Sequence, residues 1–156
     1  MASYSFATVW AIEAPIEAVW GVLVASDLWP EWWPYLKRVV QIAPGDLDGI
    51  GAITHYRWRG PLPYCLTFDM IITRVERPFN LGGTARGDLE GTGLWSLMGH
   101  GSGTTFVRYD WNVRTTKAWM NLMAPIARRL FVWNHDVIMR AGERGLSHRL
   151  GRGEGS

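Results

Sequence analysis

The sequence predicts an α+β protein in which a curved antiparallel sheet of seven strands wraps around one long C-terminal helix. Strand-like segments follow one another without an intervening helix from residue 36 to residue 114, which favours an antiparallel meander. After the possible N-caps Thr115 and Thr116, the chain then runs to Ala141 without a glycine, as is typical of a long helix.

The composition indicates one domain. The chain has 156 residues and a formal net charge of +2, and 47% of its residues are hydrophobic and 19% charged. We place a single domain at residues 1–150 and a disordered C-terminal tail at residues 151–156. Because there is no apolar run of about 18 residues, we expect no integral membrane association. The first residues also lack the basic start of a signal peptide, so we expect a cytoplasmic protein.

The N-terminal part predicts a strand and two short helices. Residues alternate from Tyr4 to Ile12, with Trp10 on the apolar parity, which is typical of a half-buried strand. Pro15 suits the first turn of a helix, and the apolar residues of 16–24 keep helical spacing. Residues 27–35 contain two prolines and three tryptophans, so we expect a broken helical turn packed on another element.

Six further strands are separated by turns rich in glycine, proline and aspartate. We assign them to residues 36–43, 50–59, 64–75, 79–87, 90–98 and 104–114. The helix that follows is expected to bend at Pro125. The stripe predicted to face the sheet consists of Trp119, Leu122, Met123, Ile126, Leu130, Trp133, Val137 and Ile138. The residues predicted mostly behind it are Arg128, Val132, His135 and Met139.

Strand register decides which side chains face inward, because a slip of one residue exchanges the two faces. With a turn at residues 61–63, Tyr56 meets Phe68 on one face. On the other face, His55 meets Asp69, so polar residues join polar residues. A turn at residues 87–89 likewise pairs Ala85 with Gly91 and Leu81 with Trp95 on the apolar face.

The last hairpin places large rings over glycines. With a turn at residues 99–103, the apolar register sets Trp95 against Val107 and Gly93 against Tyr109. It also sets Gly91 against Trp111. Glycine allows a sheet to bend sharply, and an aromatic ring then covers the bare backbone.

The inward parity gathers a large share of the ten tryptophans, five tyrosines and five phenylalanines. A bent sheet and a straight helical stripe leave space between them, so we expect an apolar cavity of roughly 300 to 1,000 Å³. The alternative is that the rings fill this space themselves, as close packing favours. The candidate ligand-binding residues are Trp10, Tyr56, Trp58, Phe68, Met70, Trp95, Tyr109, Trp111, Trp119, Met123, Trp133 and Asn134.

The sequence offers little support for a catalytic site or a metal site. The His55–Asp69 pair and Cys65 lie on the outward parity, where they cannot touch a ligand in the cavity. The single cysteine and four scattered histidines have no metal-ligand spacing, so we expect neither a metal nor another cofactor. Asn134 has two possible roles: a structural hydrogen bond to the sheet or first helix, or an anchor for a polar group of the ligand.

The expected partner is a small hydrophobic molecule. The aromatic residues alternate with aliphatic rather than basic ones, so we expect no nucleic acid. The chain is expected to be a monomer or a homodimer, and exposed tryptophans at Trp29, Trp32 or Trp33 are an alternative interaction surface. The tip at Leu62 is either a gate at the cavity mouth or an ordinary turn.

Three segments resemble a known superfamily: WPEWWPYL at residues 29–36, GDLEGTGLW at 87–95, and YDWNVRTTKAWMNLMAPIARRLFVWNHDVIMRAGERGL at 109–146. Together with the element order, they resemble the START/Bet v 1 helix-grip superfamily, in particular bacterial polyketide cyclase/dehydrase and lipid-transport (SRPBCC) proteins. The resemblance implies a helix-grip fold with a hydrophobic pocket between sheet and helix, used for binding, transport or occasionally catalysis.

Within that superfamily, members that cyclise polyketides place several polar side chains in the pocket. Here the inward parity offers mainly Tyr56, Tyr109, Thr8, Thr54 and Asn134. We therefore expect binding or transport of a polyketide-like aromatic compound or a lipid, with a polyketide cyclase/dehydratase as the alternative.

Overall fold

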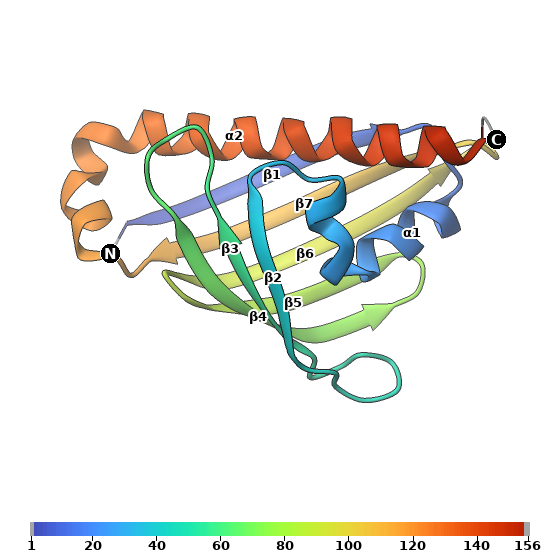
Figure 1. Cartoon of the computed structure of the whole chain (residues 1–156), viewed down its shortest axis with the longest axis horizontal. Helices are drawn as coiled ribbons and strands as arrows, with labels where there is room; N and C mark the ends of the chain where they lie inside the picture. Colours follow the sequence, from blue (N-terminus) through green and yellow to red (C-terminus); the bar gives the residue numbers. More distant parts are fainter. Residues whose placement is uncertain (1, 155–156) are drawn as a thin grey trace.

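The computed structural model describes residues 2–154 as one curved sheet covered by a long helix (Figure 1). Its strands are β1 (Ser3–Ile12), β2 (Leu36–Ala43), β3 (Ile53–Trp58), β4 (Leu66–Glu76), β5 (Asn80–Gly87), β6 (Leu89–His100) and β7 (Thr104–Thr115). They form one seven-stranded sheet in the order β1-β7-β6-β5-β4-β3-β2, and each neighbouring pair is antiparallel. The predicted α+β class and meander are confirmed.

Two short helices connect β1 to β2. Helix α1 (Ile16–Val24) begins directly after Pro15, whose extended conformation suits the residue before a first turn. The 3₁₀-helix η1 (Ser26–Glu31) contains Pro30, which lacks the N–H that a continuing α-helix needs. The broken helical turn predicted after α1 is therefore present, and it buries Trp29.

Helix α2 (Ala118–Glu154) crosses the open side of the sheet. Figure 1 shows its first turns bent down over one end of the sheet, and Pro125 lies inside this part of the helix, as expected for a proline bend. The tail expected from residue 151 is described as far as Glu154, and there the backbone continues the helix. Gly151 has no left-handed φ that would end it.

The predicted inward stripe of α2 is wrong for six of its eight residues, whereas Ile138 does line the cavity. Trp119, Leu122, Met123, Ile126, Leu130 and Trp133 are exposed, and the buried residues are Met120, Ala124, Ala127, Phe131, Asn134, Met139, Ala141 and Leu146. Contact with the tryptophans after α1 explains this rotation. A Cβ at Gly142 would lie 2.6 Å from the ring of Trp33, and one at Gly145 would overlap the carbonyl oxygen of Trp32. Small residues therefore decide which face of α2 lies inward, and the largest apolar residues do not.

Most of the predicted registers are confirmed. In β3 and β4, Tyr56 pairs with Phe68 and His55 with Asp69. In β5 and β6, the predicted partner of Ala85 is Gly91, and that pair is present.

The register of the last hairpin is displaced by two residues. Trp95 pairs with Tyr109 instead of Val107, and Gly93 pairs with Trp111 instead of Tyr109. Gly91 accordingly faces Val113. The turn consists of residues 101–103, with Gly101 at φ +66°, which fits a three-residue hairpin with a left-handed glycine. Because the displacement is even, every side chain keeps its predicted face.

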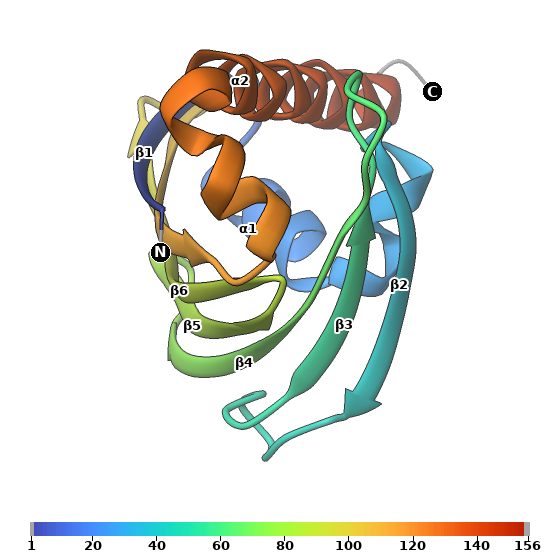
Figure 2. The same cartoon turned by 90° about the vertical axis from the view of Figure 1, so that its left-hand side faces the viewer.

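The sheet curls until β1 and β2 lie on opposite sides of α2 (Figure 2). At Gly93, the inner surface carries no side chain, and a Cβ there would lie 2.5 Å from the Tyr109 hydroxyl oxygen and 2.9 Å from the Trp111 ring. The predicted arrangement of rings over a glycine therefore exists, although at a different pair.

Within residues 2–154, no helix is long and apolar enough to cross a membrane.

Candidate functional site

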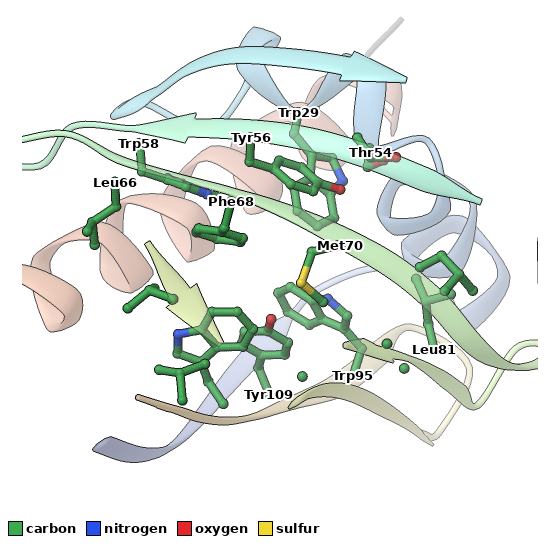
Figure 3. Close-up of a pocket in the computed structure, with 18 of the residues that line it drawn as sticks. Trp29, Thr54, Tyr56, Trp58, Leu66, Phe68, Met70, Leu81, Trp95 and Tyr109 are labelled. Carbon is green, nitrogen blue, oxygen red and sulfur yellow. The ribbon is translucent and has the colours of Figure 1, made fainter. Parts of the chain in front are cut away.

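A cavity of about 310 Å³ lies between the inner face of the sheet and helix α2. Strands β1 to β7, helix α1, η1 and α2 all contribute lining residues. Figure 3 shows side chains from opposite walls, such as Tyr56 and Phe68 on one side and Trp95 and Tyr109 on the other, directed toward the same space. The volume of the cavity lies near the lower end of the range found for ligand pockets.

Stacked rings form one wall of the cavity. Trp95 and Tyr109 have centroids 4.0 Å apart at 22°, and Tyr109 and Trp111 lie 5.7 Å apart at 20°. These pairs stand on β6 and β7, where Gly93 leaves room for the rings to lie flat against the backbone. Phe68 continues the aromatic surface, with its ring 5.5 Å from that of Trp111.

The tryptophans that follow α1 pack in the interior. Trp29, Trp32 and Trp33 are 7%, 6% and 2% exposed, which overturns the alternative that they form an exposed interaction surface. The Trp33 Nε1–H donates to the carbonyl oxygen of Ile138 at 2.9 Å, and the Trp29 Nε1–H donates to that of Leu23 at 3.1 Å. These bonds satisfy buried indole nitrogens while the rings fill one end of the space under α2.

Two thirds of the candidate site residues lie where the sequence placed them. The candidates that line the cavity are Tyr56, Trp58, Phe68, Met70, Trp95, Tyr109, Trp111 and Asn134. Trp10 is buried but stands behind the wall, covered by Trp33 at 5.4 Å and Trp95 at 5.3 Å. Trp119, Met123 and Trp133 are 43%, 43% and 48% exposed and do not line the cavity, because α2 presents a different face than predicted.

Like Met139, His135 lines the cavity although the sequence reasoning placed it elsewhere. It was expected behind the helix stripe, but its ring stacks on Phe6 with centroids 3.7 Å apart at 10°. Burial lowers the pKa of His135 from 6.5 to about 4, although the nearby Asp136 charge acts in the opposite direction. The imidazole is therefore neutral at pH 7. Correct alignment of α2 over the inward parity of β1, which includes Phe6, would have found it.

Asn134 holds the loop between β3 and β4 against α2. Its Oδ1 accepts a hydrogen bond from the Leu62 N–H, and its Nδ2 donates to the Tyr64 hydroxyl, both at 3.2 Å. Asn134 thus has a structural role, with the loop as its partner rather than the sheet or α1. It also lines the cavity, so its role as an anchor for a ligand stays a prediction. Leu62 is half-buried against the core, so the tip of this loop is packed rather than free.

The tyrosine hydroxyls of the cavity are uncharged at neutral pH. Burial raises the pKa of Tyr56 to about 12 and that of Tyr64 to about 12, and it raises the pKa of Tyr109 further. Hydrogen bonds from Ser26 and Thr54 oppose this shift at Tyr56 but are weaker than burial. These hydroxyls can donate or accept hydrogen bonds, but they do not act as bases at pH 7.

The remaining chemical candidates lie away from the cavity. His55 Nδ1 and Asp69 Oδ1 are 2.6 Å apart on the outer face of the sheet, with side chains 37% and 38% exposed. Cys65 accepts a contact from the Arg57 guanidinium at 3.7 Å and is not among the lining residues. Across residues 2–154, no group of three or more histidine, cysteine or acidic side chains is arranged to hold a metal ion.

Comparisons with known proteins identify the fold. Neither protein-family models nor curated proteins match the sequence. Solved structures do match. The Zhui aromatase/cyclase from Streptomyces sp. R1128 has a TM-score of 0.74 at 12% identity, covering 97% of this chain and 95% of its own. A START superfamily protein from Mycobacterium smegmatis has a TM-score of 0.74 at 13% identity, covering 95% and 97%.

A further solved structure shares the same architecture. Norcoclaurine synthase of Thalictrum flavum, solved with a transition state analogue, has a TM-score of 0.60 at 12% identity and covers 95% of this chain and 97% of its own. At such identities the similarity defines the fold: this chain has the START-like helix-grip fold, as the sequence predicted. Because one fold can carry many unrelated functions, the shared fold does not decide between binding and catalysis.

Proposed function

We propose that this protein binds a small hydrophobic molecule, such as a polyketide-like aromatic compound or a lipid, in the cavity between the sheet and α2. The observation that carries the proposal is the lining itself. Rings from β3, β4, β6 and β7 surround about 310 Å³, and Asp48, which is exposed, is the one acidic side chain among the described lining residues. An apolar guest would release water from this surface without leaving a charge unpaired.

Apolar burial is sufficient for useful affinity. Enclosing about 200 Å² of ligand surface contributes about 5 kcal/mol at about 25 cal/mol per Å², before the costs of association are subtracted. The flat rings of Trp95, Tyr109 and Trp111 favour a ligand with aromatic faces, because offset stacking adds to simple burial. The hydroxyls of Tyr56 and Tyr109 offer hydrogen bonds to a ligand carbonyl or hydroxyl.

Neighbouring residues on β3 provide a matched test. Thr54 is buried and lines the cavity, whereas His55 faces outward. Fluorescence titration with the neutral probe N-phenyl-1-naphthylamine should show saturable binding to the unmodified protein. Thr54→Phe, which fills part of the cavity, should weaken binding at least tenfold, whereas His55→Phe should leave it unchanged. Absence of saturable binding, or equal effects of the two variants, would refute the proposal.

The alternative is a cyclase- or dehydratase-type enzyme that uses the same cavity. The position of His135 favours this alternative, because a neutral imidazole at the cavity wall can accept a proton at pH 7. Its lowered pKa makes it a weak base, so substrate positioning would provide most of the rate enhancement. Turnover of an aromatic polyketide precursor that falls at least a hundredfold in His135→Phe, while probe binding persists, would support the enzyme.

A further inference from the structure

Four buried side-chain atoms have no hydrogen-bond partner within residues 2–154: the hydroxyl oxygen of Tyr4, the Nε1 atoms of Trp10 and Trp32, and the Nδ1 of His135. Native proteins contain few such atoms, because a buried polar atom without a partner loses the hydrogen bonds that it makes to water in the unfolded chain. Trp10 and Trp32 do not line the cavity, whereas Tyr4 and His135 do. A molecule bound in the cavity can therefore reach the polar atoms of Tyr4 and His135.

The ring of Phe6 connects these two residues. Tyr4 and Phe6 stand two residues apart on β1, and their ring centroids lie 5.9 Å apart at 5°. The Phe6 ring stacks in turn on the ring of His135, with centroids 3.7 Å apart at 10°. Because both rings pack on Phe6, β1 and α2 bring the two polar side chains to one part of the cavity wall.

Tyr64 adds a hydrogen-bond donor to this part of the wall. Its hydroxyl oxygen accepts a hydrogen bond from the Asn134 Nδ2 at 3.2 Å, so its own O–H remains available to donate into the cavity that it lines. Burial raises the pKa of Tyr64 to about 12, and the Tyr4 phenol adds to this shift, as expected for two neighbouring hydroxyls. Tyr4, Tyr64 and His135 together form what we call the polar subsite.

The polar subsite carries no charge at pH 7. Burial raises the pKa of both tyrosines and lowers that of His135 to about 4. None of the described lining residues is a lysine or an arginine. Arg128 does not line the cavity: its guanidinium lies 4.4 Å from the centre of the Tyr4 ring and donates to the Ser3 carbonyl oxygen at 2.6 Å. A carboxylate at the polar subsite would have no counter-charge in the cavity wall, so the subsite favours an uncharged group.

A hydroxyl group is the uncharged group that can pair with either kind of atom in the polar subsite. It accepts a hydrogen bond from a tyrosine O–H, and it donates to or accepts from the imidazole nitrogen according to the tautomer of His135. A carbonyl oxygen can only accept. We propose, on the basis of the binding function proposed above, that the ligand is an uncharged hydroxylated aromatic compound whose hydroxyl group lies against the polar subsite.

Two probes of the same shape test this inference. 2-Naphthol carries a hydroxyl group where 2-methylnaphthalene carries a methyl group, and both can be measured by competition with N-phenyl-1-naphthylamine. Tyr4→Phe combined with His135→Phe should weaken the binding of 2-naphthol at least tenfold and change that of 2-methylnaphthalene less than twofold, because the methyl group makes no hydrogen bond. Tyr35→Phe is the matched control: it removes a tyrosine hydroxyl outside the cavity and should leave the binding of both probes unchanged.

The outcomes separate the polar subsite from the cavity as a whole. If the combined substitution weakens both probes equally, or neither, the subsite is refuted while binding in the cavity stands. If the unmodified protein binds none of the three probes, the proposed binding function fails and this inference fails with it.

A measurement on the unmodified protein does not depend on the folding of a variant. In long-range ¹H–¹⁵N spectra, 2-naphthol should shift the Nδ1 signal of His135 at least threefold more than 2-methylnaphthalene does. Equal shifts with the two probes would overturn the inference.

Discussion

Replacing His135 by phenylalanine should remove much of the acid sensitivity of this fold. The ring stacks on Phe6, and burial lowers its pKa from 6.5 to about 4 despite the adjacent Asp136. Phenylalanine keeps the stacked ring but cannot bind a proton. At pH 7.5 the substitution should therefore change the free energy of unfolding by less than about 1.5 kcal/mol, as expected for a swap of similar volume.

The magnitude follows from the two pKa values. Between pH 6.5 and 4, the unfolded chain binds a proton at His135 and the folded protein does not, so stability falls as the pH falls. At about 1.36 kcal/mol per pKa unit, moving from pH 7.5 to pH 4.5 costs about 2.5 kcal/mol from this residue. This is a substantial part of the roughly 5–15 kcal/mol that stabilises a typical domain.

Urea denaturation at pH 7.5 and pH 4.5, at one protein concentration, measures this effect. The original protein should lose about 2.5 kcal/mol more than His135→Phe between these pH values, because carboxylate titration is common to both. His100→Phe, at an exposed position on β6, should behave like the original protein. The reasoning is refuted if His135→Phe loses as much stability in acid as the original protein does.

Three further substitutions, with Phe79→Ala as a control, test how the cavity walls are built. Trp33→Ala should lower the free energy of unfolding, measured by urea denaturation, by about 4 kcal/mol, because it removes a buried ring and an indole hydrogen bond. Phe79→Ala, at a 55% exposed position, should lower it by less than about 1 kcal/mol. Gly93→Ala should cost about 1–3 kcal/mol in the same assay, because its Cβ would meet the Tyr109 hydroxyl at 2.5 Å; an unchanged midpoint would contradict the ring packing. Asn134→Ala should lower the free energy of unfolding by about 1–3 kcal/mol and speed proteolysis between β3 and β4. If the variant and the original protein are cleaved there at equal rates, Asn134 is not the residue that holds this loop.

The sheet was predictable because its signals are local. Alternation along each strand and the residues of each turn predicted the strand order and the faces of the β3–β4 pairs, including the inward Tyr56 and outward His55. Phe79, predicted on the apolar face opposite Leu97, is instead 55% exposed. The last hairpin was displaced by two residues because several turns fit the sequence between His100 and Thr104. Because a displacement by two residues leaves each side chain on the same face of the sheet, the aromatic wall was still predicted correctly.

The orientation of α2 was not predictable from hydrophobicity. Large apolar residues such as Leu122 and Ile126 are exposed, while small residues such as Gly142 and Gly145 face the tryptophans that follow α1. This orientation depends on a close approach between segments more than a hundred residues apart, which periodicity cannot detect. The same error placed Trp133 inside and His135 outside.

The indole groups of the protein provide a direct test of whether the cavity accepts a guest. In ¹H–¹⁵N spectra recorded during titration with 1-naphthol, the Nε1–H signals of Trp58, Trp95 and Trp111, whose side chains line the cavity, should shift and saturate together. The Nε1–H signal of Trp133, which is 48% exposed and does not line the cavity, should stay within experimental error. No shift at the three cavity tryptophans at saturating 1-naphthol, or a shift confined to Trp133, would contradict the account.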